Sequence, residues 1–178
     1  MELIQQKGTL TVDSSEQKKI LFEYSVEYNA LRILVMLRYA GDGLINSKTK
    51  FSFLDFLLRY PICLKYITTK MHVKEQFSKA ELNSIDKKME KHITSAWDPD
   101  YYNYLGFLEA RGLVEVNCKD RFEIRITPLG EKVLSEFDGP EFQKLVRRSN
   151  LLNKLYGHKD ELAIKEVIDK NFAFVKIC

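Results

Sequence analysis

The order of secondary structure can be predicted from one stretch, WDPDYYNYLGFLEARGLVEVNCKDRFEIRITPLGEKVLSEF, which spans Trp97–Phe137. Apolar residues at helical spacing fill Tyr101–Arg111, and Gly112 follows at the point where the helix should end. Leu113–Val116 and Arg121–Ile126 then alternate apolar and polar side chains around a short polar turn. This alternation predicts a β-hairpin with one buried face and one solvent-exposed face.

A second helix is predicted directly after the hairpin. Thr127 is a good N-cap, and Pro128 suits the first helical position, where no backbone N–H is needed. The apolar residues of this helix are Leu129, Val133, Leu134 and Phe137. Helix, hairpin and helix in this order form the core of a winged helix. We therefore predict a mainly α protein with a small β-hairpin, built as a winged helix-turn-helix with additional helices before and after.

Helices are also predicted in front of this unit. Ser14 has capping-box spacing, and apolar residues in three- and four-residue steps predict a long helix that runs to Gly41–Gly43. Asn46–Lys50 is expected to be a polar connection. After it, Phe53, Leu54, Leu57 and Leu58 share one helical face. Two short helices that meet at Pro61 resemble half of a helix-turn-helix.

The rest of the chain extends this helical pattern. A loop is predicted over Lys70–Ser78, followed by a helix that Ser78 and Glu81 cap and that runs to about Ile93. Two further helices are predicted over Glu141–Tyr156 and Asp160–Asn171. The apolar tail Phe172–Ile177 is expected to form a strand or a docking segment. We divide the chain into an N-terminal helical region (1–95), the winged-helix unit (96–138) and a C-terminal helical extension (139–178). No low-complexity linker separates them, so one compact body is expected.

Composition limits the class of protein. The chain has 178 residues, 45% of them hydrophobic, which is enough for a packed core. The net charge of +3 is only mildly basic for a nucleic-acid binder. Cys63, Cys118 and Cys178 are far apart and form no C-x-x-C, which favours a reduced, cytoplasmic protein. The apolar run Ala30–Leu37 contains Arg32 and is too short to span a membrane, and no secretory signal is evident.

Residues typical of catalysis or metal binding do not gather in the sequence. His72, His92 and His158 are isolated and lack metal-ligand spacing. Gly41–Gly43 lacks the spacing of a phosphate-binding loop, so it is interpreted as a helix stop. We therefore predict a protein that is not an enzyme, with no catalytic residues, no cofactor and no metal.

Basic residues of the hairpin suggest a possible contact with DNA. Lys119, Arg121 and Arg125 lie at its tip and on its wet face, where winged helices contact phosphates. Asp120 and Glu123 interleave with them and cancel much of the charge.

The helix that would read bases carries little chemistry for that task. Its outward positions are Asp100, Asn103, Gly106 and Phe107, and the basic residue is Arg111, near its end. A helix that reads the major groove should present several basic or amide side chains. An outward aromatic residue favours a protein partner instead. Phe107 and Arg111 are thus candidate contact residues.

A second basic cluster is predicted after the winged-helix unit. Lys144, Arg147 and Arg148 lie close together on the next helix. They fit a solvated helix face, or a contact with DNA or with an acidic partner.

Part of the hairpin region resembles a family of transcription regulators. The resemblance rests on Leu105–Val114, Asp120-Arg121 and Ile126–Gly130, which are similar to the wing of multidrug-resistance-type (MarR-like) regulators. It covers about a quarter of the chain. It implies a winged-helix fold and, as an alternative function, a MarR-like DNA-binding transcription regulator.

A longer pattern resembles a different family. It consists of Phe53–Pro61, a helix that carries Met89, then Ser95–Pro99 and Tyr101-Tyr102, followed by the wing. In order and spacing it resembles the middle component of ABC-three-component systems, which includes the LmuC-like subunits of Lamassu defence operons. This resemblance spans roughly residues 20–137.

The second resemblance implies a function and a set of partners. Such subunits are non-enzymatic adaptors between an SMC- or Rad50-like ATPase and an effector, often a nuclease, in bacterial anti-phage and anti-plasmid defence. The adaptor would hold the effector inactive until foreign DNA is sensed. DNA contacts would be made through the complex, in the cytoplasm and with no membrane.

Overall fold

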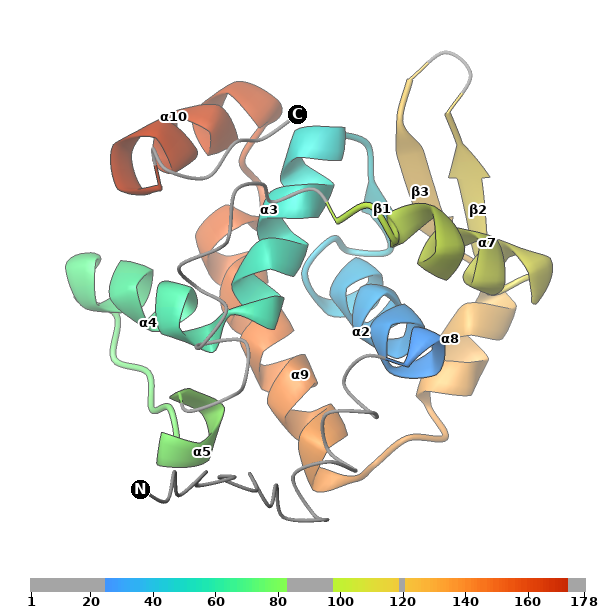
Figure 1. The fold of residues 1–178 in the computed structure, drawn as a ribbon, viewed down its shortest axis with the longest axis horizontal. Coiled ribbons are helices and arrows are strands. Elements are labelled where there is room, and N and C mark those ends of the chain that lie inside the picture. The colour runs from blue at the N-terminus through green and yellow to red at the C-terminus, as the bar shows by residue number, and fades with distance from the viewer. Residues whose placement is uncertain (1–24, 83–97, 119–120, 173–178) are drawn as a thin grey trace, which may run out of the picture.

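The computed structural model describes residues 25–82, 98–118 and 121–172. They form a mainly helical body with one small antiparallel sheet (Figure 1). In chain order the elements are α2 (Val26–Tyr39), β1 (Leu44–Ile45), α3 (Lys48–Arg59), α4 (Pro61–Lys70), α5 (Lys79–Leu82), α7 (Tyr101–Ala110), β2 (Val114–Asn117), β3 (Glu123–Ile126), α8 (Pro128–Leu134), α9 (Pro140–Leu152), a π-helical turn (Asn153–Gly157) and α10 (Glu161–Asn171).

Some predictions lie outside the described residues. These are the cap at Ser14, the helix that was expected to reach Ile93, and the apolar tail after Phe172. Elsewhere the predicted helices and the hairpin are confirmed, with ends that differ by a few residues. Among the helices within the described ranges, none combines the length and the apolar character needed to cross a membrane.

The central helix is α2, which packs against α3, α7, α8, α9 and the sheet. Its residues Ile33–Leu37 are all buried, because neighbours cover the helix on every side. Ser25 caps its first turn by accepting a hydrogen bond from the backbone N–H of Tyr28 (3.1 Å). The predicted stop after the helix is confirmed, since Gly43 has a φ of 86°, which glycine adopts without strain.

The sheet has the strand order β1-β3-β2, and both pairings are antiparallel. The alternating pattern predicts β2 and β3 but not β1, because two residues are too few to show alternation. The expectation of a polar connection over Asn46–Lys50 is wrong. Ser47 instead caps α3 by accepting a hydrogen bond from the N–H of Lys50 (3.2 Å), and α3 starts at Lys48.

Helix α3 is buried on more faces than the sequence pattern indicated. Phe53 makes an edge contact with Tyr156 beyond the end of α9 (ring centroids 5.2 Å apart). Phe56 makes a similar contact with Phe172, the last described residue (5.5 Å). Pro61 then begins α4, as predicted. The C-terminal extension therefore shares one hydrophobic core with the rest of the chain.

A buried ionic cluster joins α2, α3 and α7. Asp55 of α3 has an exposure of 0% and accepts two hydrogen bonds from Arg32 of α2 (2.7 and 3.1 Å). The Nε of Arg59 lies 3.0 Å from the same carboxylate. The hydroxyl of Tyr101, the first residue of α7, donates a third hydrogen bond to Asp55 (2.7 Å). Arg59 also pairs with Asp98 before α7 (2.9 Å), so the cluster determines where α7 starts.

The pKa values in this cluster agree with the geometry. Burial alone would raise the pKa of Asp55, but the charges of Arg32 and Arg59 and the hydrogen bonds outweigh burial and lower it. Burial and the charge of Asp55 raise the pKa of the Tyr101 hydroxyl well above its ordinary value. Tyr101 therefore stays protonated as a donor, and Asp55 stays ionised as an acceptor.

Replacing Asp55 by asparagine should destabilise the fold strongly. Asp55→Asn leaves the buried guanidinium of Arg32 without its counter-charge and leaves Arg59 with Asp98 alone, and losing one partner of a buried pair costs about 3–5 kcal/mol. Urea unfolding followed by circular dichroism measures this loss. Glu123→Gln, which removes the partner of a half-exposed ion pair, is the control and should change stability by less than about 1 kcal/mol. A loss at Asp55 no larger than the control's would contradict the role of the cluster.

Asp55→Asn should also change how the free energy of unfolding depends on pH in the acidic range. Because the pKa of Asp55 is lowered in the folded state, its contribution is present above the ordinary carboxyl pKa and is lost as the pH falls below about 4. The wild-type unfolding free energy should fall in that range, and Asp55→Asn should show a shallower fall.

Candidate interaction surface

One side of α7 packs on the core and the other faces solvent. The buried residues are Tyr101, Tyr104, Leu105 and Leu108, which agrees with the helical spacing predicted for this stretch. On the opposite side, Tyr102 is the most exposed large hydrophobic side chain of the described residues, at 69%. Gly112 ends the helix with a φ of 67°, in the left-handed conformation common after helix C-termini.

The hairpin of β2 and β3 extends from the helical body beside α7 (Figure 1). Residues directly opposite each other share a face, so the register separates its two sides. Val116 pairs with Ile124 on the side toward the core, whereas Glu115 pairs with Arg125 on the other side. Glu123 also lies 3.5 Å from Arg125. Arg121 is exposed at the described end of the hairpin, so two arginines and two glutamates belong to this side.

A pocket of about 360 Å³ lies between α7 and the hairpin. Its lining residues are Lys48, Tyr102, Leu105, Gly106, Glu109, Val116, Cys118 and Phe122. The lining is mainly apolar, and Lys48 and Glu109 are its charged residues. Phe122 makes an edge contact with Phe51, whose ring centroid lies 5.5 Å away.

Gly106 of α7 lines this pocket without a side chain. Within the described chain, no atom outside its own neighbourhood lies within 4 Å of the point that a Cβ would occupy there. A glycine inside a helix costs about 1 kcal/mol relative to alanine. At Gly130 of α8, the packing of the chain itself requires glycine, because a Cβ there would overlap the carbonyl oxygen of Leu113. Gly106 has no such reason among the described contacts.

The predicted contact residues at the end of α7 lie together. Phe107 is half-buried against the core, and the guanidinium of Arg111 stacks over its ring, 3.5 Å from the centroid. Arg111 also donates to the carbonyl of Phe107 (3.3 Å). Arg121 and Arg125 are exposed on the hairpin, and Lys119 lies outside the described residues.

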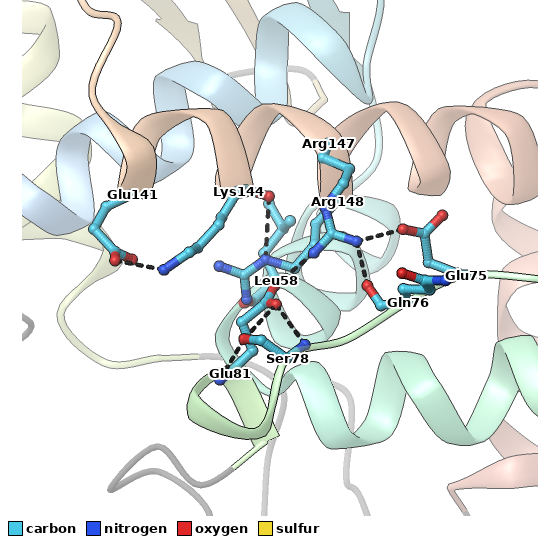
Figure 2. Close-up of polar contacts among 9 residues, drawn as sticks. All are labelled: Leu58, Glu75, Gln76, Ser78, Glu81, Glu141, Lys144, Arg147 and Arg148. Carbon is cyan, nitrogen blue, oxygen red and sulfur yellow. Dashed lines mark hydrogen bonds and ion pairs between the residues drawn. The ribbon is translucent and has the colours of Figure 1, made fainter.

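Of the predicted cluster on α9, Arg147 points toward the segment that includes α5 (Figure 2). Arg147 forms ion pairs with Glu75 and with Glu81 (2.7 Å to the latter) and donates to the carbonyl oxygen of Gln76. The capping box of Ser78 and Glu81, predicted from the sequence, is present in the same place. Arg147 therefore holds α9 to the loop in front of α5.

The two neighbours of Arg147 are also engaged within the chain (Figure 2). Arg148 is 7% exposed and donates to the carbonyl oxygen of Leu58 near the end of α3 (3.0 Å). Lys144 pairs with Glu141 one turn away (2.6 Å). The prediction that these three basic residues lie on one helix is confirmed. Arg147 and Arg148 bind groups of the same chain instead of facing solvent.

Metal-binding and reactive groups are sparse in the part of the chain that the structure describes. There, no three or more His, Cys, Asp or Glu side chains are grouped so that they could hold a metal ion. Cys63 is buried, whereas Cys118 is exposed at the pocket.

Comparisons of this chain with protein-family models, with curated proteins and with solved structures give no match.

Two glycine substitutions should have opposite effects on stability. Gly106→Ala should stabilise the fold by about 1 kcal/mol, because it adds a Cβ in open space and removes the backbone cost of glycine. Gly130→Ala should destabilise it by about 1–3 kcal/mol, because the new methyl group meets the backbone of Leu113. Thermal and urea unfolding measure both. Destabilisation by Gly106→Ala would contradict the open space at the position of the new Cβ.

Proposed function

We propose that this chain is a non-enzymatic adaptor subunit that bridges an SMC- or Rad50-like ATPase and an effector nuclease in a bacterial anti-phage and anti-plasmid defence complex. The observation that carries the proposal is the surface of α7 and the hairpin. It combines an exposed tyrosine, an apolar pocket and balanced charge, which are properties of protein interfaces.

We propose in addition that α2, β1, α3, α7, β2 and β3 form a winged helix. The strand order β1-β3-β2 and the succession of three helices and a hairpin support this interpretation. In it, α7 takes the place of the recognition helix and β2–β3 is the wing. Helices α4 and α5 are then insertions between the second and third helices.

The charges around α7 support a protein partner over DNA. Asp100 and Glu109 are exposed on α7 and its cap, and Arg111 is stacked on a ring. A helix that enters the major groove meets a dense row of phosphates, so acidic groups there oppose binding. On a protein interface, mixed charges at the rim of an apolar pocket provide specificity.

The residues that carry the family resemblance also support the proposal, because they meet in space. Asp55 and Arg59 belong to the Phe53–Pro61 stretch, whereas Asp98 and Tyr101 belong to the second stretch. All four are joined in the buried ionic cluster. The order and spacing shared with the family thus correspond to one physical unit, which links the turn before α7 to α3.

The alternative is a MarR-like DNA-binding transcription regulator. The same strand order favours it, as does Arg121, which is exposed near the hairpin tip where a wing contacts phosphates. DNA binding by the isolated chain separates the two proposals.

Purification of the chain with the products of its neighbouring genes tests the adaptor proposal. We expect an ATPase and a nuclease subunit to co-elute with it. Tyr102→Ala should weaken the complex by about 2 kcal/mol, or roughly thirtyfold, because exposed aromatic anchors dominate such interfaces. Tyr66→Ala, at a half-exposed tyrosine on α4, is the matched control and should leave the affinity unchanged. If the wild-type chain elutes alone, the adaptor proposal is wrong.

Gel-shift titration at physiological salt tests the alternative. For an adaptor we expect at most weak, sequence-independent binding that falls steeply with salt. A regulator should instead bind a palindrome with a Kd of about 10⁻⁸ M or lower and lose affinity on Arg121→Ala. Arg38→Ala, which removes an exposed arginine on α2, provides the control for net charge.

A further inference from the structure

Helix α4 turns one side to the core and a basic side to solvent. Its buried residues are Pro61, Cys63, Leu64, Ile67 and Thr68. Its exposed residues, which we call the α4 face, are Lys65, Tyr66, Thr69 and Lys70. Successive residues of a helix are rotated by about 100°, so the two lysines lie at the edges of this face and the two hydroxyl side chains lie between them.

The positive charge of the α4 face is not balanced by acidic residues close to it in the sequence. No Asp or Glu occurs from Tyr60 to Lys74. Glu75, the first acidic residue after this stretch, is already paired with Arg147 of α9. The end of α10 adds Asp169 and Lys170, which are both exposed and whose charges cancel.

The contacts of the α4 face are with neutral groups. The Nζ of Lys70 donates a hydrogen bond to Oδ1 of Asn171 at the end of α10 (2.9 Å) and lies 5.6 Å from the ring centroid of Tyr66. The same ring contacts Phe172 (centroids 6.2 Å apart), although it is 50% exposed. Within the described ranges, no carboxylate forms an ion pair with Lys65 or Lys70. The face therefore combines an ordered ring with uncompensated positive charge.

The residue types of the α4 face match the phosphate groups of a nucleic acid. Lysine is depleted in protein interfaces, whereas Lys, Thr and Tyr side chains all bind phosphate oxygens. Reading of base edges uses mainly Arg, Asn and Gln, and the α4 face has none of them. A helix that lies on a membrane inserts a row of large apolar side chains, whereas this face offers the single ring of Tyr66.

We infer that the α4 face binds the phosphate backbone of a nucleic-acid duplex without regard to its sequence. Each of the two lysines neutralises one phosphate, and the hydroxyl groups of Tyr66 and Thr69 donate to phosphate oxygens. This inference goes beyond the proposed function, because α4 lies on the side of the body away from α7 and the hairpin (Figure 1). A protein can therefore contact α7 while a duplex contacts α4.

Fluorescence anisotropy tests the inference with the full chain and two labelled DNA duplexes of equal length and unrelated sequence. The affinity is measured over a series of salt concentrations for the wild type and for a variant with Lys65→Gln and Lys70→Gln. A control with Arg121→Gln and Lys132→Gln removes the same charge from exposed residues of the hairpin and α8. Thermal unfolding shows that all three proteins are folded.

We expect the wild type to bind both duplexes equally, with an affinity that falls steeply with salt. The α4 variant should bind about tenfold more weakly, and the slope of log affinity against log salt concentration should decrease by about two, because each contacted phosphate contributes about 0.9. The control should change the affinity less than about twofold, since salt screens charges that are more than a Debye length from the duplex.

The inference is overturned if the wild type binds neither duplex at low salt, if it prefers one sequence, or if the control loses as much affinity as the α4 variant. Tighter binding to vesicles of an anionic phospholipid, with the same dependence on Lys65 and Lys70, would also overturn it. The adaptor proposal can fail separately. If the ATPase and nuclease co-elute but the α4 variant binds DNA like the wild type, the α4 inference is wrong and the adaptor stands. If the α4 variant loses DNA binding but the chain elutes alone, the reverse holds.

Discussion

The arrangement of α2, α3 and α7 depends on the neutralisation of one buried carboxylate. Asp55 is removed from water, which is costly for a charged group, and Arg32 holds it through both of its oxygens. Arg59 and Tyr101 bind the same carboxylate from two other directions. Apolar contacts in a core tolerate small shifts, but these bonds have fixed distances and directions. The cluster therefore joins the three helices at one point through polar contacts, in addition to the apolar area that they bury.

Two hydrogen bonds from Thr127 join the end of the hairpin to the residues that follow α7. The hydroxyl of Thr127 donates to the carbonyl oxygen of Gly112 (2.7 Å), and its N–H donates to that of Leu113 (3.0 Å). Gly130 packs against the backbone of Leu113, so α8 is joined closely to the base of the hairpin. Both walls of the pocket are thus tied to the same framework. A preformed pocket binds a partner with a smaller loss of conformational entropy than a mobile one.

Local sequence patterns were sufficient for much of this fold. Helical periodicity located α2, α3 and α9, and Thr127-Pro128 marked the start of α8. Tertiary partners could not be predicted in this way. Arg32 looked like an interruption of an apolar stripe, because its partner Asp55 lies on another helix. The basic residues Arg147 and Arg148 fitted a solvated face for the same reason.

The pocket was missed because it arises where two elements meet. The outward position of Gly106 was predicted, but one helix cannot show that open space lies beside it. The continuation of the apolar side of the hairpin from Val116 to Cys118 and Phe122 was the available signal. A glycine on the preceding helix, combined with this apolar side of the hairpin, indicates a gap between the helix and the hairpin.

Around α7, the way in which the chain uses its basic residues favours a protein partner over DNA. Arg147 and Arg148 hold α9 in place, Arg111 lies on the ring of Phe107, and Arg125 faces two glutamates. Arg121 is exposed near the hairpin tip, but acidic residues balance most of the other positive charge on the described surface around α7, so attraction at long range is weak. For the proposed protein partner, affinity would come from apolar burial at short range, which depends far less on salt than phosphate contacts do. The buried cluster and the exposed residues therefore have separate roles: the cluster positions α7, and the exposed residues decide what the surface of α7 can contact.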